Sequence, residues 1–299
     1  MSEKHPIIAV TGSSGAGTST VKTAFEHVFF RENVQPCIVE GDSFHRYDRV
    51  AMRERVAQAL AEGGNLSHFG PEANHFAELE ALFRGYSSAG TGKRRFYLHN
   101  DDEAARYDQQ PGTFTPWEDL PPDTDILFYE GLHGGVATDD VNAAQFVDLL
   151  IGVVPIVNLE WIQKIHRDTV DRGYEQVDVT NNILRRMHDY VHYITPQFSL
   201  TDINFQRVPT VDTSNPFVAR DIPTAHESYV VIRFRDPARF DIDFQYLLAM
   251  LHGSFMSRRN TIVVPGGAMG LAMELIITPI IETLVERRRK VMKTARQKD

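Results

Sequence analysis

The stretch IIAVTGSSGAGTST, residues 7–20, passes from an apolar run into a glycine-rich turn and then into a helical pattern. An apolar run without alternation predicts a strand buried on both faces of a parallel sheet. The glycines of the turn would let several backbone N–H groups converge on one anion at a helix N-terminus. The stretch therefore predicts a nucleotide-phosphate site rather than a plain glycine-rich turn.

The spacing of this turn fits the P-loop template G-x-x-x-x-G-K-S/T at every fixed position except the lysine. Thr18 stands in the lysine position, and the next residue, Ser19, has a hydroxyl suited to coordinating Mg²⁺. Another side chain must then supply the missing positive charge. We expect the nucleotide phosphates to be bound by Gly12, Ser13, Ser14, Gly15, Ala16, Gly17, Thr18, Ser19 and Thr20.

The length and composition of the chain are those of an ordinary enzyme. Its 299 residues, without a clear interdomain linker, predict a single domain over 1–299. A net charge of −9 argues against general affinity for nucleic acid. Cys37 is the single cysteine, the N-terminus lacks a signal-peptide pattern, and we expect no apolar run to approach the ~18 residues of a membrane span. We therefore expect a cytoplasmic protein without a membrane or nucleic-acid partner.

Two further apolar runs end in acidic residues. Residues 37–39 lead into EGDSFHR, and ligands of parallel sheets bind beyond the carboxyl ends of the strands, so Asp42 is a candidate for chemistry. The run DILFYEG, residues 125–131, matches a Walker B element, in which Glu130 would hold Mg²⁺ opposite Ser19. The alternative for either acid is a helix cap.

A charged stripe follows the apolar run of residues 149–157. On a helix, the charged side chains of EWIQKIHRDTVDRGY, residues 160–174, fall within one arc of roughly 140°. Alone, such a stripe is typical of a solvated helix face with i,i+4 pairs. After a strand of a nucleotide-binding sheet it predicts a charged lid, and Lys164 is then the leading candidate for the charge missing at Thr18.

Several other segments have clear patterns. We expect helices over residues 48–62, 74–85 and 244–251, strands after Thr201 and over 261–264, and a C-terminal helix interrupted by Pro279. A helix ending at Pro196 would carry Arg185 and Arg186 on its polar side. Residues 94–120 predict a hairpin around a polar loop, a plausible substrate flap. His68 and His75 are expected to be solvated, because no further ligand completes a metal-binding spacing.

The motifs together resemble the phosphoribulokinase family, bacterial type. They are the P-loop with threonine for lysine, EGDSFHRYDR, FYEGLHGG and NLEWIQKIHRD, and the likeness extends to TDINFQRVP, VDTSNPF and IVVPGG. The resemblance implies a P-loop NTPase-like α/β fold, with a mixed, mainly parallel sheet flanked by helices and an added β-hairpin. It also implies transfer of the γ-phosphoryl of ATP, with Mg²⁺, to the 1-hydroxyl of ribulose 5-phosphate. The product, ribulose 1,5-bisphosphate, serves carbon fixation in the Calvin cycle.

The same resemblance implies roles for individual residues. Asp42 would be the catalytic base, and Glu130 would help to bind Mg²⁺. Lys164 and Asp168 would act in catalysis within a charged segment that closes on the substrates. Contacts to the sugar phosphate would come from His45, Arg49, Arg167 and Arg172.

Bacterial members of the family respond to NADH as activator and AMP as inhibitor and form octamers, and we expect the same here. Effector residues could be Arg31, Arg185, Arg186 or Arg233, although each could equally be an ordinary surface arginine. A thioredoxin-controlled disulfide in the P-loop region is excluded, because that region has no cysteine. Two alternatives stay open: a kinase of the uridine or pantothenate type, and a regulator that binds ATP without transferring phosphate.

Overall fold

The computed structural model describes residues 2–12, 18–154, 156–171, 173–219 and 221–296. Five of the predicted phosphate-binding residues, Ser13, Ser14, Gly15, Ala16 and Gly17, therefore lie outside the described residues, as does Arg172. For Thr18, Ser19 and Thr20 the structure gives the helical backbone and not the surroundings of the side chains.

An eight-stranded sheet forms the centre of the structure, in the order β2-β5-β1-β6-β7-β8-β10-β9. The strands from β2 to β7 run parallel to one another, and β8, β10 and β9 join antiparallel at one edge. The predicted mixed, mainly parallel sheet is confirmed. The strands are β1 (Ile7–Gly12), β2 (Pro36–Glu40), β5 (Ile126–Gly131), β6 (Leu149–Val153), β7 (Ile203–Pro209), β8 (Ser228–Phe234), β9 (Phe255–Arg258) and β10 (Thr261–Pro265).

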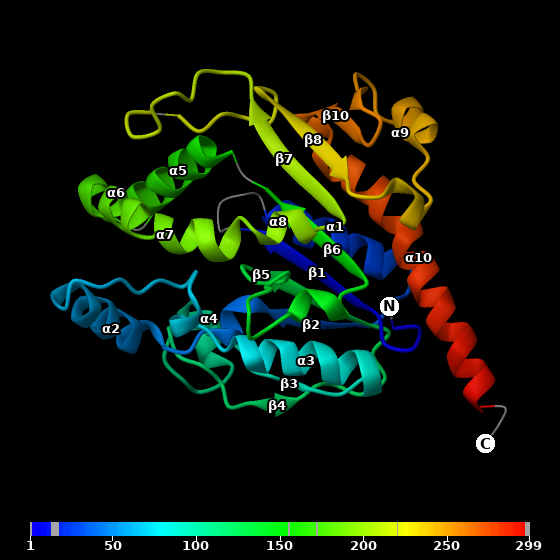
Figure 1. Ribbon diagram of the computed structural model, residues 1–299, viewed down its shortest axis with the longest axis horizontal. Coiled ribbons are helices and arrows are strands. Elements are labelled where there is room, and N and C mark those ends of the chain that lie inside the picture. The colour runs from blue at the N-terminus through cyan, green and yellow to red at the C-terminus, as the bar shows by residue number, and fades with distance from the viewer. Residues whose placement is uncertain (1, 13–17, 155, 172, 220, 297–299) are drawn as a thin grey trace.

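Helices cover both faces of the sheet because successive residues of the buried strands point in opposite directions. Ile8 and Val10 of β1 pack into the core beneath α1 (Thr18–Arg31), α9 (Phe244–Met250) and α10 (Met269–Arg296). Ile7 and Ala9 pack into the core beneath α3 (Phe76–Ala89). Figure 1 shows α1 and α10 on one side of the sheet and α3 on the other. The uninterrupted apolar run of β1 thus supplies both cores.

The C-terminal helix corrects our expectation about membrane spans. Residues 266–294 are long and apolar enough to cross a membrane by length and composition, and half of their most apolar window is buried inside the protein. Met273, Ile277 and Ile281 of α10 lie in the core against the sheet. The helix is therefore apolar because it covers the sheet. It also continues through Pro279 instead of being interrupted there.

The predicted hairpin exists in a shorter form. Its paired ends are β3 (Lys93–Arg94) and β4 (Glu118–Asp119), with a bridge between Tyr97 and Phe114. The polar segment at its tip is not all loop as expected, because it contains the short helix α4 (Asp101–Ala105). Asn100 caps this helix by accepting a hydrogen bond from the Glu103 backbone N–H at 2.9 Å, and Asx capping favours even a short helix.

Most of the remaining helices project from the end of the sheet where the parallel strands finish, at the left in Figure 1. They are α2 (Arg49–Ala61), α5 (Val157–His166), a π-helical turn (Arg167–Asp171), α6 (Gln176–Arg185), α7 (Met187–Asp189), a second π-helical turn (Tyr190–Ile194) and α8 (Gln197–Leu200). Single-turn 3₁₀ segments are Gly41–Phe44, Pro71–Ala73, Ala143–Phe146, Pro237–Phe240 and Gly266–Ala268.

The prediction that Arg186 lies on the polar side of the helix before Pro196 was wrong. Leu184 and Val191 are exposed, whereas the guanidinium of Arg186 lies 3.9 Å from the ring centroid of Phe69. The irregular turn between α6 and α7 and the π-helical turn that follows shift the face that points inward. Burial lowers the pKa of Arg186 to about 10.

Candidate active site

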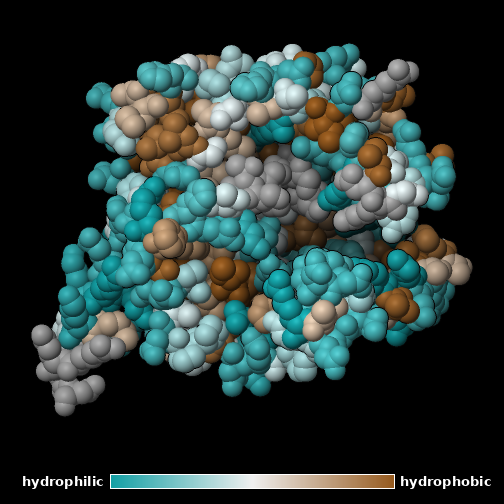
Figure 2. All heavy atoms as spheres, turned by 180° about the vertical axis from the view of Figure 1, so that it is seen from behind, coloured by the Kyte–Doolittle hydropathy of each residue, from teal (hydrophilic) through white to brown (hydrophobic). Residues whose placement is uncertain are grey.

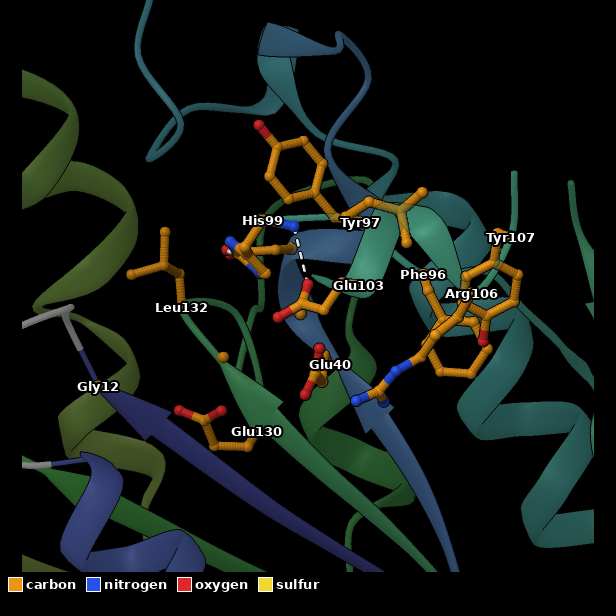
Figure 3. A pocket seen from close by; sticks show the side chains of 14 residues that line it. Gly12, Glu40, Phe96, Tyr97, His99, Glu103, Arg106, Tyr107, Glu130 and Leu132 are labelled. Atoms are coloured by element: carbon orange, nitrogen blue, oxygen red, sulfur yellow. Dashed lines mark hydrogen bonds and ion pairs between the residues drawn. The ribbon is translucent and has the colours of Figure 1, made fainter. Parts of the chain in front are cut away.

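A cavity of about 650 Å³ opens at the carboxyl ends of β1, β2 and β5. Its floor contains Gly12, Glu40 and Glu130, which are the last or next-to-last residues of these three strands. Figure 3 shows the carboxylates of Glu40 and Glu130 directed into this space. Figure 2 shows the surface hollowed between its two halves, with hydrophilic side chains along much of the border.

Two glycines let the acidic strand ends come close together. A Cβ on Gly41 would lie 2.5 Å from the Tyr129 hydroxyl and 2.8 Å from the Gly131 Cα atom. A Cβ on Gly131 would meet the Gly41 Cα atom at 2.6 Å. These distances exclude any larger side chain at either position. The two loops that carry Asp42 and Glu130 are therefore packed backbone to backbone.

Asp42 lines the cavity from the 3₁₀ turn Gly41–Phe44, and 41% of its side chain is exposed. Its Oδ1 lies 3.2 Å from His45 Nε2, and its Oδ2 lies 3.7 Å from His99 Nε2. Desolvation by itself would raise the pKa of this carboxyl group. The hydrogen bond and charge of His45, with smaller effects of His99 and His68, outweigh desolvation and lower the pKa to about 2. Asp42 is therefore a carboxylate at neutral pH.

His45 is buried beside Asp42. Its Nδ1 lies 2.8 Å from Asn74 Oδ1, and its ring packs against that of His68 in a tilted arrangement, with centroids 4.2 Å apart. The expectation that His68 is a solvated loop residue was wrong, because burial, with a smaller effect of the charge of His45, lowers its pKa well below the ordinary value. His75 is half-buried and lies 3.2 Å from Glu78 Oε1. No cluster of three potential metal ligands of the His, Cys, Asp and Glu types occurs among the described residues.

Arg49 begins α2 and reaches across to the hairpin. Its guanidinium donates a hydrogen bond to the His99 carbonyl oxygen at 2.8 Å, and its backbone N–H donates to the Gly112 carbonyl oxygen at 2.9 Å. Gly112 has a φ of +90°, and a Cβ there would lie 2.8 Å from Arg49 Nε. Arg49 thereby fixes the hairpin over the cavity.

The predicted charged stripe forms one ion-pair cluster. Lys164 Nζ lies 2.5 Å from Asp168 Oδ2, and Arg167 Nε lies 3.2 Å from Asp168 Oδ1. The side chains of Lys164 and Asp168 are 16% and 6% exposed. Burial lowers the pKa of Lys164, although Asp168 opposes this effect. For Asp168 burial acts to raise the pKa, but the bonds from Lys164 and Arg167 leave it lowered.

The structure separates the predicted residues into two groups. The fourteen residues that line the cavity include Gly12, Asp42 and Glu130. They do not include the other described candidates, His45, Arg49, Lys164, Arg167 and Asp168. The charge of Arg186 lowers the pKa of both His68 and Lys164, so Arg186 links the His45 cluster with the charged stripe.

Sequence reasoning missed several residues of the cavity. Glu40 lies opposite Glu130 in the register of β2 and β5, and it accepts a hydrogen bond from Lys22 Nζ of α1 at 3.2 Å. Its position at a strand end was a usable signal, since the same rule singled out Asp42, two residues further along the chain. The hairpin adds Tyr97, His99, Glu103 and Arg106, and no local pattern in the sequence indicates that they face this space.

Comparison with known proteins agrees with the family that the motifs indicate. The sequence model of the family described as "Phosphoribulokinase / Uridine kinase family" matches residues 7–214. The chain belongs to the phosphoribulokinase and uridine kinase family. Within that family, a phosphoribulokinase encoded on a plasmid of Cupriavidus necator is 63% identical over 97% of this chain and 99% of its own length. A phosphoribulokinase of Nitrobacter vulgaris is 60% identical over 97% of this chain and all of its own length.

A solved structure agrees with these sequence relatives. Phosphoribulokinase from Rhodobacter spheroides superposes with a TM-score of 0.88 at 56% identity, covering 96% of this chain and 100% of that one. The resemblance to the phosphoribulokinase family, the P-loop kinase fold and the phosphotransferase class with an alcohol acceptor are thereby confirmed. A kinase of this type uses ATP.

Proposed function

We propose that this chain transfers the γ-phosphoryl group of ATP to the 1-hydroxyl of ribulose 5-phosphate, giving ribulose 1,5-bisphosphate for the Calvin cycle. The observation that carries the proposal is the cavity that Asp42, Gly12 and Glu130 line together. Relatives at 60% identity or more over nearly the whole chain bear the name of this activity. The cavity thus combines a carboxylate for the acceptor with the end of the strand that precedes the P-loop.

Asp42 is the proposed base. Phosphoryl transfer proceeds through a loose transition state, so the enzyme mainly aligns the attacking oxygen and neutralises charge. A carboxylate with a pKa of about 2 is a weak base. Asp42 therefore orients the hydroxyl through a hydrogen bond and takes its proton late, as the bond to phosphorus forms.

The oxygen donors of the cavity fit Mg²⁺, which prefers carboxylate and hydroxyl ligands. Glu130 faces the cavity from the end of β5, beside β1 and the start of the P-loop. We assign Glu130 and Ser19 to the metal. When bound, Mg²⁺ would reduce the negative charge of the phosphate groups. Gly12, with Ser13 to Thr20, would bind the phosphates through backbone N–H groups.

The cationic residues receive the anionic groups of both substrates. His45, Arg49, Arg167 and Arg172 are assigned to the sugar phosphate. The three arginines suit it because a guanidinium group binds two phosphate oxygens at once. Lys164 supplies the charge missing at Thr18, with Asp168 holding its ammonium group in place. Because neither Lys164 nor Arg167 lines the cavity here, this assignment requires α5 and the π-helical turn to approach the substrates.

Further properties of the proposal rest on the family. The chain acts as a single domain over 1–299 in the cytoplasm, assembles as an octamer, and responds to NADH as activator and AMP as inhibitor. Among the candidate effector residues, Arg31 bonds Glu32 and Thr278 on the surface, and Arg185 bonds Asn65. Light scattering on the purified protein tests the octamer.

The decisive experiment is a substrate panel with ATP and Mg²⁺. A coupled assay compares ribulose 5-phosphate, uridine and pantothenate, each with and without NADH and AMP. We expect turnover only with ribulose 5-phosphate, raised by NADH and lowered by AMP. A clear preference for uridine or pantothenate contradicts the proposed substrate. Tight ATP binding without turnover of any acceptor favours the non-catalytic regulator.

A further inference from the structure

Asn74 is a buried residue that contacts His45, the neighbour of the proposed base Asp42. It follows the 3₁₀ turn Pro71–Ala73, and the residue is 2% exposed. Its segment pairs antiparallel with that of His45, and the Arg46 guanidinium donates to the Asn74 carbonyl oxygen at 2.9 Å. These backbone contacts place the Asn74 side chain next to the ring edge of His45 that carries Nδ1, whereas Asp42 lies next to Nε2.

The orientation of the Asn74 amide is determined by two backbone carbonyl groups. Its Nδ2 donates to the carbonyl oxygens of His68 at 2.9 Å and Gly70 at 2.7 Å. The opposite orientation would place Oδ1 against both carbonyl oxygens, leaving three acceptors without a proton between them. Oδ1 must therefore be the atom that faces His45 Nδ1, 2.8 Å away.

Acceptors consequently flank both ring nitrogens of His45. An amide oxygen only accepts, so Nδ1 carries a proton. On the other side, Nε2 lies 3.2 Å from Asp42 Oδ1, and an ionised carboxylate also only accepts. A ring that carries protons on both nitrogens satisfies both acceptors.

We propose that Asn74 is a positioning residue that holds His45 as an imidazolium against the Asp42 carboxylate. The inference deepens the proposed function, because it rests on Asp42 as the group that receives the hydroxyl proton. His45 holds Oδ1 of Asp42, and Oδ2, which lies 3.7 Å from His99 Nε2, remains for the acceptor hydroxyl. Without the amide oxygen, His45 satisfies Asp42 equally well as a neutral ring protonated at Nε2 alone.

The charged groups around His45 explain why the Asn74 amide is needed to keep a second proton on its ring. The titratable and charged groups near it are Asp42, His68, His99, His133, Arg46 and Arg95. Asp42 is the one anion among these six, and the Arg95 guanidinium donates to the His45 carbonyl oxygen at 2.5 Å. Positive neighbours oppose a second proton on His45, whereas an acceptor at Nδ1 favours it.

The direct test is ¹⁵N solid-state NMR of the substrate-free enzyme labelled with ¹⁵N-histidine, near neutral pH. His45 is assigned by subtracting the spectrum of His45→Asn. We expect both His45 nitrogens to be protonated in the wild type, and Nδ1 to lose its proton in Asn74→Leu. A wild-type ring with a bare nitrogen overturns the proposal, including the arrangement in which a protonated Asp42 donates to neutral His45.

A pair of variants separates the charge of His45 from mere packing. Asn74→Asp keeps an oxygen at Nδ1 but loses both donors to the carbonyls, whereas Asn74→Leu loses the oxygen and the donors. We expect Asn74→Leu to lower kcat by about tenfold or more, less than the roughly 10²- to 10⁴-fold of a lost base, with an unchanged KM for ATP. Asn74→Asp should recover most of this loss and keep both protons on His45.

Asn65→Leu is the matched control, because Asn65 lies in the neighbouring loop and bonds Arg185. Its kcat and its His45 signals should remain those of the wild type. A purely structural role predicts that Asn74→Asp, with its carboxylate against two carbonyls, is as impaired as Asn74→Leu, and that outcome rejects the proposal. The NMR result does not depend on the acceptor, so it stands apart from failure of the ribulose 5-phosphate assignment.

Discussion

Neighbouring residues determine both the position and the pKa of Asp42. The two strand-end glycines allow its loop to pack against that of Glu130, and His45 lowers its pKa to about 2. A carboxyl group with a pKa this far below 7 does not change its charge in the pH range where enzymes of this class are assayed. An acidic limb in the pH–rate profile above pH ~4 therefore has to come from another group.

Replacing Asp42 with Asn tests its role directly. The amide keeps the shape of the side chain but cannot accept the hydroxyl proton. We expect kcat to fall on the order of 10²- to 10⁴-fold, while the Kd for ATP, measured by calorimetry, stays within a factor of about two. Turnover at the wild-type rate would remove Asp42 as the base.

At the scale of the element, the charged stripe depends on an irregular helix. The chain runs from α5 (Val157–His166) into a π-helical turn (Arg167–Asp171) without a break. π-helical turns are rare and occur frequently at functional sites. Lys164 and Asp168 are four residues apart across this junction and form a largely buried ion pair. The junction thus holds the charges together while they lie outside the cavity.

Lys164→Met tests whether this element supplies the charge missing at Thr18. We expect a fall in kcat on the order of 10³-fold, because a cation that stabilises the transferring phosphoryl group contributes this much. The matched control is Lys290→Met, which removes an exposed lysine from an i,i+4 pair with Glu286 on α10. Steady-state kinetics of both variants with ATP and ribulose 5-phosphate decide the matter. Near-wild-type turnover of Lys164→Met would show that another group replaces the lysine.

For the whole molecule, buried histidines tie stability to pH. His133 is 3% exposed, and its Nε2 donates to the His68 carbonyl oxygen at 3.0 Å. Burial lowers its pKa to about 3, whereas an unfolded histidine titrates near ~6.5. Between these values the unfolded chain binds more protons than the folded one. The free energy of unfolding therefore decreases as the pH falls below about 6.5.

This linkage predicts a measurable loss of stability in mild acid. From pH 7 to pH 5, His133 alone should lower the free energy of unfolding by about 2 kcal/mol, with His68 acting in the same direction. Urea denaturation at both pH values measures the change. His133→Gln, which can still donate to His68, should show a smaller pH dependence, whereas the exposed-histidine variant His252→Gln should match the wild type. An equal dependence in all three proteins contradicts this account.

The sequence by itself determined the features that depend on neighbours along the chain. The apolar runs of β1, β5 and β6 predicted buried parallel strands, and the rule that ligands bind at their carboxyl ends located Asp42 and Glu130 on one cavity. The helices over 48–62 and 74–85 followed from periodicity and were confirmed as α2 and α3. The motif set also identified the family, which the comparisons confirmed.

Only the tertiary structure decided which distant side chains meet. Asn74 reaches His45 across 29 positions of sequence, and the hairpin brings His99 to Asp42. No residue pattern encodes such contacts, because they depend on how the loops beyond the strands pack and on which way each side chain points. The same reason explains the errors over His68 and Arg186, whose polarity suggested solvent and whose surroundings are aromatic rings. The P-loop strand indicates where phosphate binds, and the folded loops around Asp42 decide its charge state.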